Sequence, residues 1–327
     1  MTDRSQKNKF MKKQKVWFIT GASKGFGFEI AKAALAAGDK VVGTVRSNAE
    51  GLELALAGRK NALVGPKGGD GTSPGAGGKT LPGAGGETSP GADGETLVVT
   101  LDVTKEAEVK KGVEEAIARF GRIDVLVNNA GYGLLGAVEE VSDEEVKKQY
   151  ATNVFGLLNV TRAVLPHMRS QHSGHIINIS SLFGYLATLP GLGLYGSTKF
   201  AVEGISEGLA LEVKPFGIHV TAAAPGLFRT SFTSAESYQS SRIVLDAYKD
   251  TVGTIRVAID QLDGNQSGDP VKLAQLLVKL ANEENPPLHL PIGKDAIDSF
   301  RTKTEQMTKE VDEWETESVG TGYEVKA

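Results

Sequence analysis

The sequence predicts an α/β fold: a single domain with a doubly wound parallel sheet and helices on both faces, in three layers. Two observations lead to this prediction. Along most of the chain, short apolar segments alternate with amphipathic segments of helical spacing, which is the order of repeated β-α units. The apolar segments are also hydrophobic almost without interruption, as strands are when both faces of their sheet are covered. The domain is expected to span residues 15–320.

The expected strands are short runs rich in valine, isoleucine and other apolar residues. In chain order they are VWFIT (16–20), KVVGTVR (40–46), TLVVTLDVT (96–104), IDVLVNNAG (123–131), GHIINISS (174–181) and IHVTAAAPG (218–226). A further extended segment is expected at PPLHLPIG (286–293). Because helical segments separate the strands, the strands are expected to run parallel.

The expected helices combine apolar residues at helical spacing with recognisable end signals. Gly38 and Gly121 follow two of them, in the place where a glycine commonly ends a helix. Ser142 and Glu145 have the spacing of a capping box at the start of another. A segment at 232–250 is expected to be helical in part. The remaining helices are expected at 28–38, near 50–57, and at 105–121, 142–168, 198–217, 269–285 and 295–315.

Residues 59–95 break this alternation. Within them, 72–95 read TSPGAGGK, TLPGAGGE and TSPGADGE, which are three tandem octads with little apolar surface. Such a segment cannot offset the entropy that it would lose on ordering, so 59–95 is expected to be a disordered insertion. Closing a longer loop costs little more, so the domain is expected to tolerate the insertion. The first 14 residues are polar and basic and are expected to form a flexible tail.

Composition argues against several classes of protein. The formal net charge of -4 does not suit a nucleic-acid binder. Because the chain has no cysteine, it has neither disulfides nor thiolate metal ligands, and His167, His172 and His175 lack an acidic partner close in sequence, so no metal site is expected. The sequence has no run of 18 apolar residues, so no membrane span is expected. It also shows no secretory signal, so a cytoplasmic location is expected.

A glycine-rich loop, TGASKGFG (20–27), follows the first expected strand and opens the first helix. In this setting Gly21 allows a sharp turn, Gly25 lets the backbone approach a pyrophosphate, and Gly27 lets helix and strand pack closely. Amide groups at the helix start then face the phosphates. The loop therefore predicts a dinucleotide site.

The residues after the second strand indicate which dinucleotide is bound. An acidic residue about 20 positions after the glycines would hold the 2′-hydroxyl of the adenosine ribose, but here the chain reads TVRS, with Val45 and Arg46. Arg46 and Lys24 instead suit a 2′-phosphate, through charge-assisted hydrogen bonds. NADP(H) is therefore favoured over NAD(H).

Five motifs occur in order at strand ends or helix starts: TGASKGFG, NNAG, INISS, YGSTK and PGLFRT. Together, over residues 16–230, they resemble the classical short-chain dehydrogenase/reductase (SDR) family, which implies a Rossmann-type sheet. The glycine spacing T-G-x-x-x-G-x-G is similar to that of the classical branch. The carboxyl-terminal part, with PPLHLPIG and a charged last helix, resembles the retinol- and hydroxysteroid-dehydrogenase-like members.

The resemblance implies four catalytic residues. Tyr195 corresponds to the proton donor and acceptor, and Lys199 to the residue that holds the nicotinamide ribose and lowers the tyrosine pKa. Ser181 matches the serine that positions the substrate, and Asn153 the asparagine of a proton relay. Ser181 precedes Tyr195 by fourteen residues, whereas thirteen is usual in the family, so Ser180 remains an alternative.

The resemblance also implies the cofactor contacts. Asp102 resembles the residue that touches adenine, the segment 128–131 lies along the cofactor, and Thr230 meets the carboxamide. The full set of expected cofactor residues is Gly21, Ser23, Lys24, Gly25, Phe26, Gly27, Arg46, Asp102, Val103, Asn129, Ala130, Gly131, Tyr195, Lys199, Pro225, Gly226, Phe228 and Thr230.

The chemistry of Tyr195 and Lys199 agrees with these roles. Hydride transfer to a carbonyl leaves an oxygen that needs a proton, and a tyrosine can give one. Its reference pKa near 10 is too high for easy transfer in both directions, and a lysine one helical turn away is expected to lower it. Ser181 would fix the carbonyl. The expected activity is an NADP-dependent oxidoreductase (EC 1.1.1.-) acting on a carbonyl or a secondary or lipophilic alcohol.

The expected substrate pocket is mostly apolar, which suits a hydrophobic small molecule. It is expected to include Leu182, Phe183, Tyr185, residues 189–194 and the part after Pro225, with a specificity segment at 230–268. By family resemblance, helices 142–168 and 198–214 form the interface of a homodimer or homotetramer. Two alternatives stay open: a non-catalytic NADP-binding sensor on the same fold, and dehydration or epimerisation on this scaffold.

Overall fold

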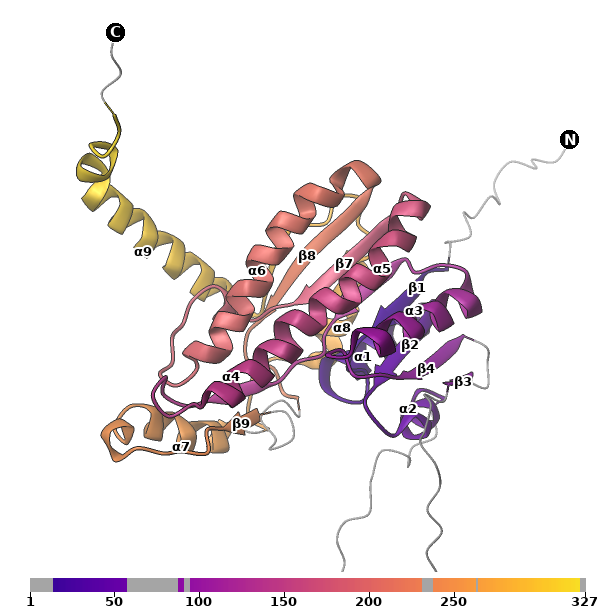
Figure 1. Cartoon of the computed structure of the whole chain (residues 1–327), viewed down its shortest axis with the longest axis horizontal. Helices are drawn as coiled ribbons and strands as arrows, with labels where there is room; N and C mark the ends of the chain where they lie inside the picture. The colour runs from indigo at the N-terminus through magenta and orange to yellow at the C-terminus, as the bar shows by residue number, and fades with distance from the viewer. Residues whose placement is uncertain (1–13, 58–87, 91–94, 231–237, 263, 324–327) are drawn as a thin grey trace, which may run out of the picture.

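The computed structural model describes residues 14–57, 88–90, 95–230, 238–262 and 264–323, and its centre is an eight-stranded sheet (Figure 1). The strand order is β10-β8-β7-β5-β1-β2-β4-β3, and the first seven strands run parallel. These seven are β1 (Val16–Ile19), β2 (Lys40–Val45), β4 (Thr96–Thr100), β5 (Val125–Asn128), β7 (Gly174–Ile179), β8 (Ile218–Pro225) and β10 (His289–Ile292).

Helices cover both faces of the sheet, so the predicted Rossmann-type, three-layer α/β fold is confirmed. One face carries α1 (Gly25–Ala36) and α8 (Pro270–Leu280), and the other carries α3 (Glu106–Phe120), α5 (Leu157–Gln171) and α6 (Gly193–Val213). The further helices are α2 (Ala49–Leu56), α4 (Asp143–Tyr150), α7 (Val252–Leu262) and α9 (Lys294–Val319), with 3-10 turns at Leu182–Gly184, Lys214–Phe216 and Asp246–Tyr248.

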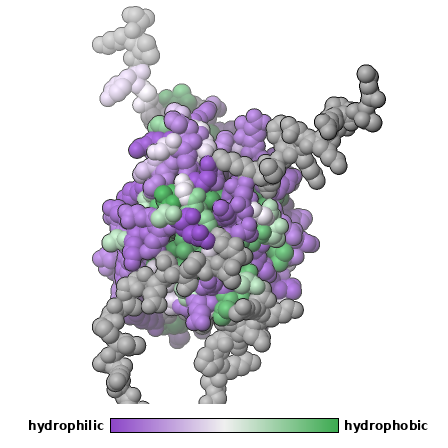
Figure 2. All heavy atoms as spheres, turned by 90° about the vertical axis from the view of Figure 1, so that its right-hand side faces the viewer, coloured by the Kyte–Doolittle hydropathy of each residue, from purple (hydrophilic) through white to green (hydrophobic). Residues whose placement is uncertain are grey.

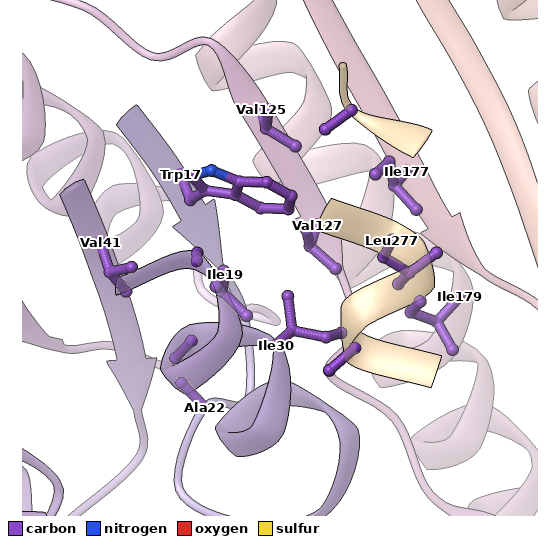
Figure 3. Close-up of a cluster of buried hydrophobic side chains, with 14 of the residues drawn as sticks. Trp17, Ile19, Ala22, Ile30, Val41, Val125, Val127, Ile177, Ile179 and Leu277 are labelled. Carbon is purple, nitrogen blue, oxygen red and sulfur yellow. The ribbon is translucent and has the colours of Figure 1, made fainter. Parts of the chain in front are cut away.

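Strand β1 shows why the sheet must be covered on both sides. Trp17 and Ile19 pack in the cluster under α1 and α8, whereas Val16 and Phe18 pack in the cluster under α3, α5 and α6. All four are buried, and successive side chains of a strand point to opposite faces. Figure 3 shows the first cluster, in which side chains of β1, β5, β7, α1 and α8 meet. An uninterrupted apolar run therefore supplies both layers of the core.

The outer surface differs from this core. The face shown in Figure 2 is mostly hydrophilic, with hydrophobic residues exposed in small groups. The large apolar side chains lie between the layers instead, as burial of apolar surface favours. Among the helices of the described residues, none combines the length and the apolar character that crossing a bilayer requires.

The segment 142–168 shows which helix features the local sequence predicts and which it does not. The capping box is confirmed, because the Ser142 side chain accepts from the backbone N–H of Glu145 and the Glu145 side chain accepts from that of Ser142. The helical segment expected over 142–168 is confirmed, and a π-helical turn, Ala151–Gly156, lies within it between α4 and α5. A π turn accommodates one more residue per turn, and the apolar periodicity on either side does not reveal it.

The segment after β8 also differs from expectation. Residues 231–237 lie outside the described residues, and Tyr238–Ser240 form a strand, β9, parallel to β6 (Gly133–Leu135). Helix α7 begins only at Val252 and was not predicted. The backbone of β6 offers hydrogen-bonding partners that are far away in sequence, so propensity alone could not place β9.

Three residues of the expected disordered insertion form regular structure. Thr88–Pro90 are β3, which pairs antiparallel with β4 at the edge of the sheet. An edge strand presents unpaired backbone groups, and pairing with them requires no apolar side chain. Residues 59–87 and 91–94 of the insertion lie outside the described residues, as does nearly all of the expected tail.

Candidate active site

Four predicted motifs meet at the carboxyl ends of the parallel strands. TGASKGFG follows β1, NNAG spans the end of β5, and INISS and PGLFRT extend beyond β7 and β8. Strands β1 and β5 are neighbours, although the chain leaves β1 toward β2 on the other side. In open α/β sheets ligands bind at such a point, where the strand order reverses.

The glycine loop is shaped by contacts that leave no room for side chains. Gly21 and Gly25 have φ values of +65° and +56°, in the left-handed region. A Cβ on Gly27 would lie 2.3 Å from the Gly21 carbonyl oxygen and 2.6 Å from Nδ2 of Asn129. That nitrogen donates to the carbonyls of Thr20 at 2.9 Å and Gly21 at 3.0 Å. The backbone thus forms a cradle at the start of α1 that fits a pyrophosphate.

A pocket of about 820 Å³ lies beside this cradle. It brings together five residues that the sequence predicted to bind cofactor: Ser23, Lys24, Gly25, Arg46 and Thr230. Sequence reasoning missed Arg229 and Asn48, which also line it. Arg229 stands in the motif PGLFRT, directly before Thr230, so that motif was the available signal. Asn48 was detectable as a helix cap, since its side chain accepts from the backbone N–H of Gly51.

Two expected cofactor residues at the end of β4 do not line this pocket. The Asp102 carboxylate accepts from the backbone N–H of Thr104 at 2.9 Å and from its hydroxyl at 2.8 Å, which fixes the turn after β4. Val103 is buried in the core. At the end of β5, the backbone N–H of Ala130 donates to the hydroxyl of Thr20, 3.0 Å away.

The loop after β8 is held by a residue that sequence reasoning missed. Pro225 ends β8, and a Cβ on the next residue, Gly226, would lie 2.1 Å from Oδ1 of Asp295. The other carboxylate oxygen of Asp295 accepts from the backbone N–H of Leu227 at 2.6 Å. Phe228 packs edge-to-face on Phe26 of the glycine loop, with ring centroids 5.4 Å apart. Nothing in the sequence marked Asp295, because its partner lies 68 residues away.

Tyr195 lies on the first turns of α6 and faces the residue after β7. Its side chain is 6% exposed and hydrogen-bonds with the side chain of Ser181. The side chain of Ser180 points toward Gly184 instead, because a Cβ on Gly184 would lie 2.6 Å from the Ser180 hydroxyl. That hydroxyl is buried and has no hydrogen-bond partner among the described residues. The geometry therefore joins Ser181, and not Ser180, to Tyr195.

Lys199 and Asn153 lie close to this pair. The ammonium of Lys199 donates to the carbonyl of Ile179 at 2.7 Å and lies 5.9 Å from the centre of the Tyr195 ring. A Cβ on Gly131 would lie 3.1 Å from Oδ1 of Asn153 and 3.9 Å from Nζ of Lys199. The segment after β5 thus lies close to both side chains. All four expected catalytic residues lie together at the carboxyl ends of the parallel strands.

The π-helical turn positions Asn153. Its Nδ2 donates to the carbonyl of Tyr132 at 3.0 Å and to the hydroxyl of Thr198 at 3.1 Å, while its Oδ1 accepts from the backbone N–H of Tyr132 at 3.1 Å. The side chain therefore ties the segment after β5 to α6. Such turns are frequent at functional sites, since they redirect one side chain of a helix.

Comparison with known proteins agrees with this geometry. The sequence model of the family described as short chain dehydrogenase matches residues 86–240. Oxidoreductase BOA17 of Botryotinia fuckeliana is 35% identical over 300 residues, which are 92% of this chain and 96% of that protein. The chain belongs to the short-chain dehydrogenase family. It is an NAD(P)-dependent oxidoreductase of that family, as its relatives and structural neighbours support.

Other members of the family are similar over most of this short-chain dehydrogenase. The 3-ketodihydrosphingosine reductase of Bacteroides thetaiotaomicron is 36% identical over 84% of this chain and 86% of its own. The crystal structure of a short-chain dehydrogenase from Streptomyces avermitilis superposes with a TM-score of 0.78, at 37% identity, over 95% of this chain and all of that one.

Several structural neighbours contain a nicotinamide cofactor. A 3-ketoacyl-(acyl-carrier-protein) reductase from Brucella melitensis holds NADH (26% identity, TM-score 0.61, 85% of this chain and 96% of that one). ElxO holds NADP (27% identity, TM-score 0.64, 87% and 99%). The family therefore includes members with either cofactor.

Burial sets the protonation of the two central groups of this short-chain dehydrogenase. It raises the pKa of Tyr195 to about 12, and the hydrogen bond with Ser181 opposes this rise only in part. The expected net fall of the tyrosine pKa is therefore wrong for this site, because burial outweighs what lowers it. Lys199 is itself buried, which lowers its pKa to about 8 against the opposing attraction of Glu203. Its ammonium donates to the carbonyl of Ile179 at 2.7 Å.

We expect Lys199→Met to raise the thermal stability of the protein without added cofactor. A folded-state pKa of about 8, against 10.5 for an unperturbed lysine, means that burying the protonated amine costs about 3 kcal/mol at neutral pH. This cost is at least as large as the ~1.5–3 kcal/mol that a hydrogen bond from a charged group contributes. Because the folded state binds fewer protons between pH 8 and 10.5, the wild type gains stability as the pH rises through this range. The advantage of the variant is thus greatest below pH 8.

Thermal unfolding midpoints measured from below pH 8 up to pH 10.5 test this expectation. Lys214→Met is the matched control, because the same change on an exposed side chain should leave the midpoint almost unaltered at every pH. If the unfolding midpoints of the wild type and Lys199→Met changed with pH in parallel, burial of the protonated amine would not destabilise the protein.

Proposed function

We propose that this dehydrogenase transfers a hydride between NADP(H) and a carbonyl, or a secondary or lipophilic alcohol, with Tyr195 as the general acid and base. The observation that carries the proposal is the hydrogen bond between Tyr195 and Ser181 in a buried site, with Lys199 on the same helix one turn later. A phenol, a hydroxyl and an ammonium in this arrangement suit the protonation of a developing alkoxide.

The side chains act on the substrate oxygen in the proposed reaction. The hydroxyls of Ser181 and Tyr195 both donate to the carbonyl oxygen and so hold the carbonyl carbon in place. The bound nicotinamide supplies the hydride in reduction and accepts it in oxidation. As charge develops on the substrate oxygen, Tyr195 gives up its phenolic proton, and the ammonium of Lys199 stabilises the phenolate that remains. A pKa of about 12 keeps Tyr195 protonated at neutral pH, as a general acid must be.

Asn153 positions this machinery in the proposed mechanism. Its amide is already bound to Tyr132 and Thr198, so its contribution is to fix α6 against the segment after β5. A relay of protons through Asn153, as the family resemblance implies, would run beside Lys199, whose ammonium lies near the same glycine, Gly131.

The preference for NADP(H) rests on the charge around the 820 Å³ pocket. Lys24, Arg46 and Arg229 line it, while β2 ends in Val45 where an NAD-binding site would have an acidic residue. The one carboxylate in the lining, Glu29, is paired with Lys32 at 3.2 Å. A guanidinium in such a setting suits a 2′-phosphate.

A hydrophobic substrate fits the side chains that surround Tyr195. Leu182, Phe183 and Leu192 are buried in the same cluster as Tyr195, and Leu189 and Tyr238 pack against it. An apolar surround with two hydroxyls at one point binds a lipophilic molecule and selects its oxygen. The reductase from Bacteroides thetaiotaomicron, whose name specifies a keto substrate, supports the carbonyl as the reacting group.

The test is a panel of ketones, retinoids, steroids and sugars with NADPH or NADH, followed by the loss of absorbance at 340 nm. We expect faster turnover with NADPH, and we expect Arg46→Asp to lower kcat/KM for NADPH by about tenfold or more, since hydrogen bonds to charged groups are worth ~1.5–3 kcal/mol. The same change should improve the relative use of NADH.

Arg169→Asp is the control, because it makes the same change on an exposed residue at the end of α5, away from the pocket. An unchanged ratio of NADPH to NADH use in Arg46→Asp would refute the phosphate assignment. Tight NADPH binding with no turnover across the panel would favour a non-catalytic binding protein instead.

A further inference from the structure

Helix α9 stands apart from the rest of the molecule. It spans 26 residues, and its first turns attach it to the body. Ala296 is buried, and Phe300 stacks on Tyr185 with ring centroids 3.9 Å apart. Beyond Lys303 the side chains are exposed, and the helix projects away from the sheet and its covering helices (Figure 1).

The projecting part carries an apolar stripe. Met307, Val311 and Trp314 are 48%, 62% and 65% exposed. Their spacing of four and three residues places them on one side of the helix, in line with Phe300 at the base. A sequence that repeats apolar residues in this way is typical of a helix that packs along a second helix.

The charges that flank the stripe are divided along the helix. Arg301 and Lys303 border it near the base, and Glu315 and Glu317 border it near the far end. Two ion pairs form within α9, one between Lys294 and Asp298 and one between Lys309 and Glu313 at 3.6 Å. Among the described residues, these four flanking side chains take part in no ion pair.

We propose that α9 is a dimerisation helix, and that α9 of a second copy of this chain covers the stripe in the antiparallel direction. One register satisfies the whole pattern. Met307 then packs against the partner's Val311, and Thr304 against the partner's Trp314. In the same register Arg301 faces the partner's Glu315 and Lys303 faces the partner's Glu317. The two-fold axis repeats each pair, as an isologous interface requires.

The charge pattern selects this arrangement over two others. A parallel pair would place Glu310 beside the partner's Glu315 and would form none of the attractive pairs, whereas the antiparallel pair has a single like-charge approach, between the two copies of Glu310. A membrane surface is disfavoured, because the helix has eight acidic residues against four basic ones, and cellular membrane surfaces are negatively charged. The second copy is the occupant that complements both halves of the helix.

Cross-linking tests the register directly. The chain has no cysteine, so Thr308→Cys introduces a single thiol at the position that meets its own copy across the two-fold axis. We expect a short bis-maleimide to link two such chains efficiently. Thr316→Cys is the matched control, since Thr316 lies on the opposite side of α9 and should give little product. Equal yields from the two variants would overturn the proposal.

Charge reversal tests the pairing. In the Thr308→Cys background, Arg301→Glu with Lys303→Glu should reduce cross-linking by at least about tenfold, as should Glu315→Arg with Glu317→Lys. An equimolar mixture of the two variants should restore it, because each then complements the other. If the mixture stays as low as its components, the charges do not guide association and the proposal fails.

The emission of Trp314 provides a second readout that other interfaces do not affect. Trp17 is fully buried and gives a constant signal, while Trp314 is exposed and should move to shorter wavelengths as the protein concentration rises. The shift should vanish in the charge-reversed variants and persist in Tyr195→Phe, since it is independent of turnover. Emission that is constant with concentration would contradict the covered stripe, even if the protein forms oligomers through other helices.

Discussion

Tyr195→Phe is expected to lower kcat by about 10²- to 10⁴-fold while leaving the Kd for NADPH nearly unchanged. The substitution removes one hydroxyl from a side chain that is otherwise packed in the cluster with Leu182 and Phe183. That hydroxyl hydrogen-bonds with Ser181 and is the proton donor in the proposed reaction. The glycine cradle and the pocket lined by Lys24 and Arg46 are not touched by the change, so cofactor binding should survive it.

Steady-state rates at 340 nm and NADPH titrations by fluorescence measure the two quantities separately. Tyr150→Phe is the matched control, because it also removes a hydroxyl that is hydrogen-bonded, at 2.9 Å to Ser197, but outside the proposed site. The control should keep most of its activity. If Tyr195→Phe lost rate and cofactor binding together, Tyr195 would be a structural residue of the cofactor site rather than its acid.

The fold could be predicted from the sequence because strands that are buried on both faces are apolar without interruption. The uninterrupted run at 16–20 and the helical periodicity that follows require no distant contact to be interpreted. The glycine loop was predictable for a similar reason, because the positive φ values of Gly21 and Gly25 and the close approach of Gly27 to the Gly21 carbonyl all arise within the loop. By contrast, β9 pairs with β6, which lies far away in the chain, so the local sequence did not place it. Strand β3 pairs with the nearby β4, but its residues, Thr88–Pro90, lack the apolar character that marks the other strands.

The residues of the candidate site could be predicted from the sequence, but their orientation and pKa values could not. Sequence spacing left Ser180 and Ser181 as alternatives, since successive residues after a strand point to opposite sides and the orientation of β7 decides between them. The pKa of Tyr195 was expected to fall because Lys199 is one turn away. Its rise to about 12 depends on how completely the fold buries both groups, a property of the assembled core.

The second large effect is expected from a substitution in the glycine cradle, at Gly27. Gly27→Ala should raise the Kd for NADPH by at least about tenfold and lower the unfolding midpoint by several degrees. A Cβ at this position would lie 2.3 Å from the carbonyl oxygen of Gly21, which belongs to the backbone and has no rotamer by which to move away. Overpacking of this kind costs ~1–3 kcal/mol. The loop must therefore open, and the amides at the start of α1 lose their arrangement.

Gly204→Ala is the control for that experiment. Gly204 lies on α6 with nothing within 4 Å of its added Cβ, so alanine should leave NADPH binding unchanged and stabilise the helix by up to ~1 kcal/mol. NADPH binding by Gly27→Ala at wild-type affinity would mean that the cofactor does not occupy the cradle. Because Gly27→Ala is expected to lose binding and turnover together, and Tyr195→Phe to lose turnover alone, the two variants separate the groups that hold the cofactor from the group that moves the proton.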